Sequence, residues 1–362
     1  MKIVIDARMY GLENAGIGRY VNNLLQELAI IDHKNSYLIL LRKKYYHTLS
    51  FGNNFHKVLA DYPHYSIREQ LLLPLCLIKL HPDLVHFPHL NVPILYHRNY
   101  LVTIHDLIKN DSKGTETTTR SPIFYWFKYL FYRLVLLVIV TKAKHILVPS
   151  LYWKKELTKR YHLPSTKIIV TYEGVDQKYF NLKKIPPPKP LLVYTGNLYP
   201  HKNLERLIQA IKVVQVDLYL ISARNAFSNH LAQTVKKLQV ENLVHFLGYL
   251  PDEKVAKIYS KATAYVFPSL MEGFGLPGLE AMSVGLPVIS SDATCLPEIY
   301  GKAALYFDPY DIKDIACKIR QLINDPNLQK KLMDMGYQQA KKYSWEKMAK
   351  ETLQNYENCV RL

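Results

Sequence analysis

The sequence predicts an α/β protein made of two domains, each with a parallel β-sheet. Short apolar runs of strand length alternate with longer segments of helical period along most of the 362 residues. One proline-rich stretch at residues 185–190 interrupts the alternation, and the chain is long enough to bury a core on each side of it. Because a strand that returns through a helix runs in the same direction as the strand before it, both sheets should be parallel.

Five apolar runs in the first half are predicted as strands. They cover residues 2–6, 37–41, 84–87, 101–105 and 145–149. Residues 20–30 repeat apolar side chains at helical spacing and should form the first crossover helix. The first strand contains an acid at Asp6 and no long apolar run, so the start of the chain does not have the pattern of a signal peptide.

The alternation resumes after the proline-rich stretch, which should be a stiff, extended linker. The strands predicted in the second half cover residues 191–194, 218–222, 244–247, 264–268 and 287–290. Helical segments from about residue 311 onward, with Trp345 near the last of them, should close the second domain. We therefore divide the chain into a domain at 1–184, a domain at 185–345 and a final helix at 346–362.

Positive charge is concentrated in the first half of the chain. Residues 1–184 contain 26 Lys and Arg against 13 Asp and Glu, whereas residues 185–362 contain 21 against 17. Such a basic field favours anionic partners, namely phosphates, anionic lipids or nucleic acid. The four cysteines form no Cys-x-x-Cys pair and no His or Cys cluster has metal-site spacing, which favours a reducing, cytoplasmic compartment.

The most informative motif places two carboxylates on either side of a glycine turn. Gly273 and Gly275 let the backbone turn its N–H groups toward an anion, and Pro277 fits the first position of a helix. The start of that helix would add partial positive charge where a diphosphate could bind. Glu272 could then accept hydrogen bonds from sugar hydroxyls, while Glu280, in the first helical turn, could bind a ribose diol.

A second motif lies upstream and predicts a strand, a turn and a helix. Gly196 ends the strand, and His201 and Lys202 follow at its carboxyl end, where an open α/β sheet binds its ligand. These two side chains are candidate diphosphate ligands, with Lys202 the one assured cation. Asn203 should cap the next helix. The apolar residues of that helix are Leu204, Leu207, Ile208 and Ile211.

The first domain has its own candidate ligand contacts. Gly16 and Gly18 precede the first helix, but Val21 stands where a dinucleotide fingerprint needs a third glycine, which argues against a dehydrogenase. His105 closes an apolar strand and should project at the carboxyl edge of the sheet, where an imidazole can donate to a sugar hydroxyl or a phosphate oxygen. An ordinary glycine turn and a solvated histidine are the alternatives, and Glu173 is predicted only as part of a turn.

Taken in order, these motifs resemble those of the retaining glycosyltransferases of family 4. The matching strings are Gly-Ile-Gly-Arg-Tyr at 16–20, Ile-His-Asp-Leu at 104–107, Glu-Gly-Val-Asp at 173–176, Gly-Asn-Leu-Tyr-Pro-His-Lys-Asn at 196–203 and Glu-x7-Glu at 272–280. The chain departs from the family where Asn197 follows the strand glycine in place of an arginine, where His201 precedes the lysine, and where Glu173 replaces an asparagine.

The resemblance implies a GT-B fold, in which two Rossmann-like domains face each other across a cleft and the last helix packs back on the first domain. It implies a donor bound mainly by the second domain, an acceptor bound by the first, and transfer with retention that needs no metal or other cofactor. No Asp-x-Asp occurs in the sequence. The resemblance assigns His105 and Glu272 to catalysis. The residues that it assigns to the nucleotide sugar are Gly16, Gly18, Gly196, Asn197, His201, Lys202, Tyr249, Leu250, Gly273, Phe274, Gly275, Leu276 and Glu280.

The two motifs of the second domain are most similar to those of bacterial mannosyltransferases of surface polysaccharide assembly. This similarity suggests GDP-mannose as donor and a glycan or polyprenyl-linked glycan as acceptor. UDP-sugars stay open as donors, because backbone groups around residues 248–250 would bind the base. A sugar-nucleotide epimerase of the same fold would not need the Glu-x7-Glu pattern, and no recognition motif for nucleic acid accompanies the basic half.

Residues 122–140 contain 16 apolar or aromatic residues in 19. Two interior cations, Lys128 and Arg133, argue against a membrane-spanning helix. A buried crossover helix and a peripheral membrane surface are the remaining alternatives. In the second case Trp126, Phe127 and Phe131 would enter the headgroup region and nearby cations would attract anionic lipid at the cytoplasmic face of the membrane.

Overall fold

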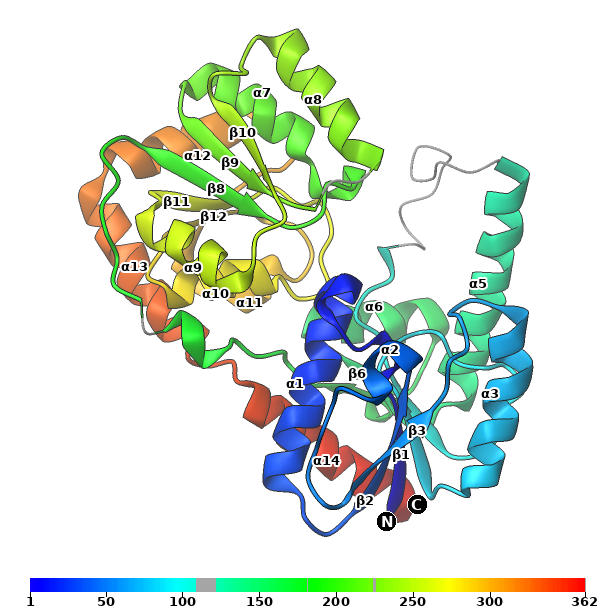
Figure 1. Cartoon of the computed structure of the whole chain (residues 1–362). Coiled ribbons are helices and arrows are strands. Elements are labelled where there is room, and N and C mark those ends of the chain that lie inside the picture. The colour runs from blue at the N-terminus through cyan, green and yellow to red at the C-terminus, as the bar shows by residue number, and fades with distance from the viewer. Residues whose placement is uncertain (109–121, 181, 224–225, 362) are drawn as a thin grey trace. The chain divides into compact units, whose positions relative to one another are not determined.

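The computed structural model describes residues 1–108, 122–180, 182–223 and 226–361, and it divides them into two compact units (Figure 1). The first unit contains residues 1–108, 122–174 and 345–361, and the second contains the described residues of 175–344. Each unit has one parallel sheet with helices on both faces, so the predicted α/β class is confirmed. Residues 175–184, which we had placed in the first domain, group with the second unit.

The sheet of the first unit has the strand order β3-β2-β1-β4-β5-β6-β7. The strands are β1 (Lys2–Asp6), β2 (Ser36–Leu41), β3 (Phe55–Leu59), β4 (Leu84–Phe87), β5 (Tyr100–Thr103), β6 (Ile146–Val148) and β7 (Ile168–Val170). The central strand β1 lies between β2 and β4, with Ile5 opposite Ile39 on one side and His86 on the other. All five predicted strands of this half are present. The sequence did not predict β3, whose middle is polar, or β7, which has three residues.

Six α-helices of the first unit contribute to its core and its surface. They are α1 (Ala15–Ile31), α2 (Lys43–Tyr46), α3 (Ile67–Leu80), α5 (Pro122–Lys142), α6 (Leu151–Tyr161) and α14 (Trp345–Arg361). The chain moves from β1 toward β2 in one direction, and from β3 to β4 and from β5 to β6 in the opposite direction. Because such crossovers are right-handed, α1 covers one face of the sheet while α3 and α5 cover the other.

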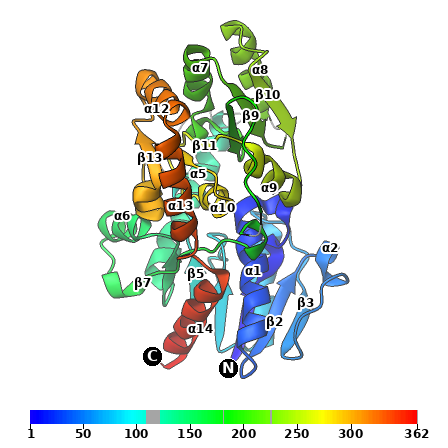
Figure 2. The ribbon, with the colours of Figure 1, turned by 90° about the vertical axis from the view of Figure 1, so that its left-hand side faces the viewer.

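The C-terminal helix α14 lies beside α1 in the first unit (Figure 2). Its buried Tyr356 hydroxyl is 2.6 Å from Nδ1 of His86 on β4, and Nε2 of the same imidazole is 2.9 Å from the Thr103 hydroxyl on β5. Burial, with the neighbouring charge of His105, lowers the pKa of His86 to about 3. The imidazole therefore stays neutral at physiological pH and serves as a hydrogen-bonded link between α14 and the sheet.

The second unit has the strand order β10-β9-β8-β11-β12-β13, again with all strands parallel. The strands are β8 (Leu191–Thr195), β9 (Asp217–Ile221), β10 (Val244–Gly248), β11 (Ala264–Phe267), β12 (Val288–Ser291) and β13 (Ala304–Phe307). The helices are α7 (Leu204–Val214), α8 (Ala226–Leu238), α9 (Asp252–Lys261), α10 (Leu276–Ser283), α11 (Leu296–Tyr300), α12 (Ile312–Asn324) and α13 (Pro326–Ala340). Helix α12 packs against α7, and α13 packs against α10.

Helix α7 shows why this half of the sequence folds as predicted. Its buried residues recur at helical spacing. They are Leu204, Leu207, Ile208, Ala210 and Ile211. Full burial of an aliphatic side chain such as Leu207 contributes about 1.5–3 kcal/mol. Helices α12 and α13 are preceded by the N-cap residues Asp311 and Asp325, whose carboxylates accept from the backbone N–H groups of Lys313 and Leu328. These two caps fix the residues at which α12 and α13 begin.

Candidate active site

The candidate site of the second unit lies where the neighbouring strands β8, β11 and β12 end. The loop after β8 carries His201 and Lys202, and the loop after β11 carries Glu272. The backbone N–H of Leu270 donates to the carbonyl of His201 at 2.8 Å, so the two loops are joined directly. The sheet therefore brings together the two motifs that the sequence predicted to act on one ligand.

Lys202 and Glu272 form an ion pair with 2.6 Å between Nζ and Oε1. Their side chains are only 11% and 10% exposed. The backbone of Glu272 is also held, because its N–H donates to the Thr294 hydroxyl at 3.2 Å and its carbonyl accepts from the Cys295 thiol at 3.3 Å. We had assigned Lys202 to phosphate and Glu272 to sugar, but had not predicted that they bind each other. Each charge is thus nearly buried and compensated by the other.

The turn between the two carboxylates is shaped by Gly275. Its φ of +93° is in the left-handed region, which favours glycine, and its carbonyl accepts a hydrogen bond of 2.6 Å from the buried Tyr300 hydroxyl. Phe274 is buried and packs edge-to-face on Tyr343, with 5.5 Å between ring centroids. Tyr300 and Tyr343 therefore support the turn, and neither was singled out from the sequence because aromatic residues are common core residues.

Helix α10 begins one residue earlier than we predicted. Gly275 is the N-cap, so Pro277 is the second helical residue and Glu280 is the fifth, beyond the first turn. The expectation that Pro277 opens the helix and that Glu280 lies in its first turn is therefore wrong by one position. Leu276 takes the first position because Gly275, rather than Leu276, can adopt the left-handed conformation at the cap. Glu280 is buried, with 5% of its surface exposed.

The loop after β8 presents one cation and one neutral imidazole. His201 stacks on Tyr199, with 5.9 Å between ring centroids and 14° between ring planes. Burial, together with the positive charge of Lys202, lowers the pKa of His201 to about 4. His201 can therefore donate a hydrogen bond to a phosphate at neutral pH but adds no positive charge. Gly196 and Asn197 precede it, and the Tyr194 hydroxyl donates to the carbonyl of Asn197 at 2.7 Å.

Asn203 stands at the start of α7 as predicted, but its side chain does not cap the helix. The backbone there has a φ of +59°, which turns the amide away from the helix N–H groups. The amide instead donates to the carbonyls of Pro268 at 3.0 Å and Pro309 at 2.8 Å. Asn203 thereby fastens the loop after β8 to the loops after β11 and β13.

Tyr249 and Leu250 follow β10, two strands away from β8 at the same edge of the sheet. Gly248 ends that strand with a φ of +73°, and Tyr249 is 62% exposed. Their proposed contact with the base remains a prediction.

In the first unit, both ring nitrogens of His105 have hydrogen-bond partners. Nδ1 lies 3.2 Å from the Glu173 carboxylate and Nε2 lies 3.0 Å from the Pro88 carbonyl. Burial alone lowers the pKa of His105, but the hydrogen bond and negative charge of Glu173 outweigh it, so the pKa is raised. Two acceptors suit an imidazolium, which donates from both nitrogens. Glu173, which we had predicted only as a turn residue, is thus the partner of His105.

The Glu173→Gln variant is expected to lower the pKa of His105 below the ordinary histidine value, because burial would remain while the compensating charge is lost. The raised pKa stabilises the wild type fully below about pH 6.5, and this contribution disappears as pH rises through the pKa of the folded state. An NMR titration of the imidazole would measure the shift, with Glu156→Gln as the control. An unchanged His105 pKa in the Glu173 variant would contradict this assignment.

Gly16 and Gly18 lie inside the first turn of α1, which begins at Ala15, so they do not form a loop before the helix as we expected. Gly18 is buried, and a Cβ there would lie 1.9 Å from the carbonyl oxygen of Gly11. Gly16 is exposed with no heavy atom near its Cβ position. Close packing therefore explains why residue 18 is a glycine. A ligand contact remains a prediction for both Gly16 and Gly18.

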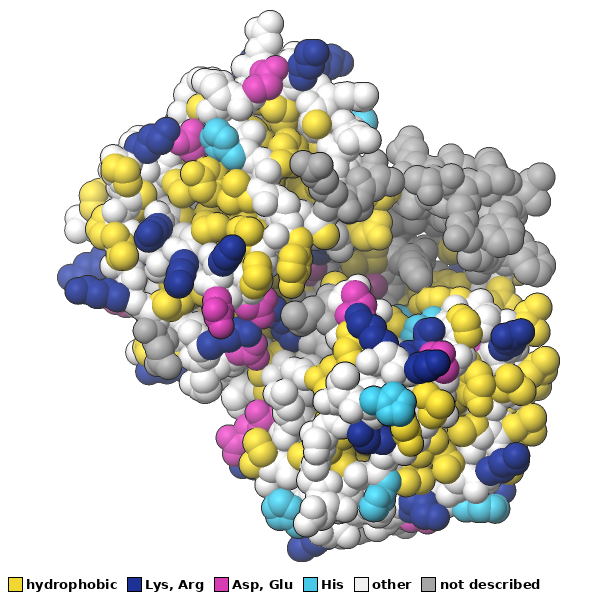
Figure 3. All heavy atoms as spheres, in the orientation of Figure 1, with side chains coloured by type: hydrophobic (Ala, Val, Ile, Leu, Met, Phe, Trp, Pro, Cys, Tyr) yellow, Lys and Arg dark blue, Asp and Glu magenta, His cyan; other side chains and the backbone are white. Residues whose placement is uncertain are grey.

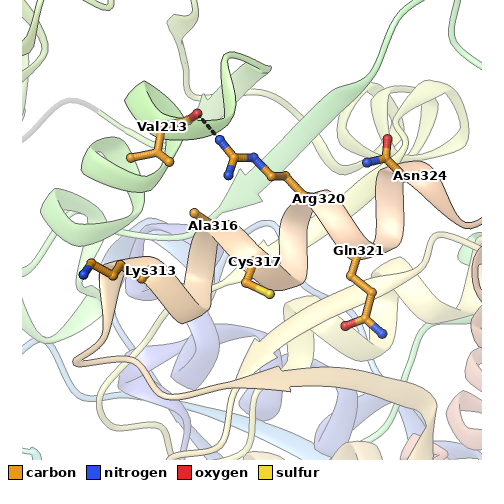
Figure 4. A pocket seen from close by; sticks show the side chains of 7 residues that line it. All are labelled: Val213, Lys313, Ala316, Cys317, Arg320, Gln321 and Asn324. Carbon is orange, nitrogen blue, oxygen red and sulfur yellow. Dashed lines mark hydrogen bonds between the residues drawn. The ribbon is translucent and has the colours of Figure 1, made fainter.

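A separate hollow of about 390 Å³ lies between α12 and α7 (Figure 4). Arg320 crosses it to donate to the carbonyl of Val213 at 2.6 Å. Cys317 and Lys313 line it from α12, and none of its lining residues belongs to the predicted site. Over the described part of the chain, no group of three or more His, Cys, Asp or Glu side chains is placed to hold a metal ion.

Two family profiles match the chain in succession. The profile of Glycosyltransferase Family 4 matches residues 15–179, and that of Glycosyl transferases group 1 matches residues 175–341. The chain belongs to glycosyltransferase family 4. It is therefore a glycosyltransferase, and the resemblance drawn from its motifs is confirmed.

One curated relative and two solved structures are similar to the chain over nearly its whole length. The O-antigen chain mannosyltransferase B of Escherichia coli is 29% identical, and the alignment covers 98% of this chain and 99% of that protein. Sucrose-phosphate synthase from Thermosynechococcus elongatus has a TM-score of 0.80 at 20% identity, covering 99% of this chain and 98% of its own. Anabaena HepE in complex with UDP-glucose has a TM-score of 0.74 at 15% identity, covering 99% and 100%. The structural matches confirm the GT-B fold.

Proposed function

We propose that this glycosyltransferase moves mannose from GDP-mannose onto a glycan or polyprenyl-linked glycan, with retention at the anomeric carbon and without a metal. The observation that carries the choice of sugar is the near full-length similarity to an O-antigen mannosyltransferase. The second unit supplies the donor site in this proposal, through Lys202, His201, Glu272 and Glu280 at the carboxyl edge of its sheet.

The ion pair between Lys202 and Glu272 supports this assignment, because a nucleotide sugar offers new partners for both charges. Its diphosphate would replace the carboxylate at the Lys202 ammonium, and its sugar hydroxyls would donate to the Glu272 carboxylate. Breaking the pair without a replacement would leave two nearly buried charges without their partner. The exchange therefore favours a ligand that offers both an anion for Lys202 and several hydroxyl donors for Glu272.

Departure of the nucleoside diphosphate builds negative charge at the leaving group. Lys202 supplies the positive side chain, His201 supplies a neutral hydrogen-bond donor, and the N-terminus of α10 supplies a fixed dipole. We assign the positioning of the transferred sugar to Glu272. We assign no nucleophile among the described side chains of the site. In a front-face mechanism, the acceptor proton would pass to the departing diphosphate. His105 stays a predicted catalytic residue on the first unit.

A UDP-sugar is the second candidate donor. HepE, which shares the fold, has been seen in complex with UDP-glucose. The backbone after β10, around Gly248 and Tyr249, would bind the base. Because backbone groups would make these contacts, the side chains there do not distinguish guanine from uracil.

Thermal unfolding with GDP-mannose, UDP-glucose and their free nucleoside diphosphates would test the donor. A ligand at about 100 times its dissociation constant adds about 2.7 kcal/mol to the free energy of unfolding. We expect GDP-mannose to raise the melting temperature of the wild type more than that of Glu280→Ala at the same concentration. Stabilisation by UDP-glucose alone would contradict the mannose assignment and favour the second candidate.

A further inference from the structure

Helix α3 of the first unit turns an apolar face toward solvent. Five of its large aliphatic side chains are 40–80% exposed. They are Ile67, Leu71, Leu72, Leu75 and Ile78. At 100° per residue these positions fall within one side of the helix, together with the exposed cations Arg68 and Lys79. The opposite side of α3, with Leu73 and Leu77, is buried in the core. A surface helix normally shows the reverse distribution, with polar residues facing water.

Helix α5 has the same character on its outer side. Leu130 is 70% exposed, and Leu134 and Leu137 are 51% and 52% exposed. Trp126 and Phe131 are also exposed, whereas the side chain of Phe127 lies outside the described part of the structure. The inner side of α5 is core, with its last turns contributing Leu136, Ile139 and Val140. Residues 122–140 are therefore part of a crossover helix, and over 129–140, where the side chains are described, it has one buried and one exposed apolar side. No helix in the described ranges is long and apolar enough to cross a membrane.

Helices α3 and α5 lie on the same side of the first unit's sheet (Figure 1), as the handedness of their crossovers requires. Tyr65, just before α3, is one of the groups whose proximity raises the pKa of Tyr132 on α5, after the larger effect of burial. Figure 3 shows hydrophobic side chains gathered over the α3 side of this unit, with Lys and Arg among them. We call the exposed residues of these two helices the α3–α5 surface.

The charges of the α3–α5 surface have one sign. Arg68 and Lys79 on α3 and Arg133 and Lys142 on α5 are exposed. Helix α5 contains no Asp or Glu, and the single acid of α3, Glu69, is buried in an ion pair with Arg8 at 2.7 Å. A second copy of the chain would bring the same cations against these and would offer them no carboxylate from either helix. An anionic lipid surface complements both the cations and the apolar side chains.

We propose that the α3–α5 surface docks this protein onto an anionic lipid bilayer as a peripheral membrane protein. The aliphatic side chains enter the headgroup region, and the four cations bind lipid phosphates around them. Both helices follow strands of the parallel sheet, so each begins at the carboxyl edge where His105 lies. Docking would thus place that edge near the membrane, within reach of a lipid-linked acceptor. This last consequence rests on the proposed function, whereas membrane docking itself does not.

Vesicle flotation of the full chain would test the proposal, with vesicles of phosphatidylcholine alone and vesicles containing phosphatidylglycerol. We expect flotation only with phosphatidylglycerol, and less of it at high salt. Each cation near an anionic membrane contributes about fivefold to binding, so replacing Arg68, Lys79, Arg133 and Lys142 by Gln should weaken binding by at least about 100-fold. The matched control replaces Lys236, Lys237, Lys330 and Lys331, exposed cations of the second unit, by Gln and should float like the wild type.

A second variant tests the apolar side chains, with Leu71, Leu75, Leu130 and Leu134 replaced by Gln. These side chains are half or more exposed, so the variant should fold and keep the thermal shift with its donor while losing flotation. Equal binding of the wild type to both kinds of vesicle would overturn the proposal. So would sedimentation of the wild type as a dimer that the leucine variant dissociates, combined with no flotation. Failure of every nucleotide sugar to bind would instead count against the proposed function alone.

Discussion

Replacing Lys202 by Ala is expected to lower kcat/KM by about 10- to 150-fold, because a charged hydrogen bond to the leaving diphosphate contributes about 1.5–3 kcal/mol. His201→Ala should have a smaller effect, since burial keeps His201 neutral. Initial rates of nucleoside diphosphate release would measure both. Full activity of Lys202→Ala would show that the backbone and the α10 dipole suffice.

The same substitution should also destabilise the second unit, because it leaves the nearly buried Glu272 without its 2.6 Å partner. The double variant Lys202→Ala with Glu272→Gln removes the uncompensated charge. We expect it to melt at a higher temperature than Lys202→Ala alone, which a double-mutant cycle would quantify. A double variant that is no more stable than Lys202→Ala would show that the pair contributes little.

Replacing the two carboxylates of the Glu-x7-Glu motif is expected to change different quantities, nucleotide affinity for Glu280 and turnover for Glu272. Glu280→Ala should weaken binding of the free nucleoside diphosphate by about 10- to 150-fold, because it removes a proposed charged hydrogen bond to the ribose diol. Glu272→Gln should leave that affinity nearly unchanged and lower kcat, because its proposed contacts are to the transferred sugar. Calorimetric titration of the nucleotide, together with steady-state rates, separates the two effects. Equal losses of nucleotide affinity in both variants would contradict this division.

Much of the fold followed from the sequence because buried parallel strands are continuous apolar runs. All ten predicted strands are present, and the helical spacing of Leu207, Ile208 and Ile211 correctly placed α7. Strands with weaker patterns were missed. β3 includes the polar pair His56 and Lys57, and β13 is a four-residue strand at the sheet edge whose two middle residues are only half-buried.

Side-chain partners were harder to predict than strands. Asn203 is a common helix cap by residue type, yet the left-handed backbone at that position sends its amide to two proline carbonyls. Glu173 and His105 are far apart in sequence and meet only because both follow strands of one parallel sheet, β7 and β5, at its carboxyl edge. The pairing of Lys202 with Glu272 depends on the same sheet topology. Such contacts depend on tertiary structure that no local sequence pattern encodes.

Hydrogen–deuterium exchange of the full chain with and without GDP-mannose tests the central claim most directly, namely that the donor binds at the carboxyl edge of the second unit. We expect slower exchange in peptides covering residues 196–203, 248–250 and 270–282, and a loss of that protection in Glu280→Ala. Peptides of α12, which line the separate hollow, should exchange at the same rate with and without the ligand. Protection at α12, or none in the three predicted segments at a saturating donor concentration, would contradict the account.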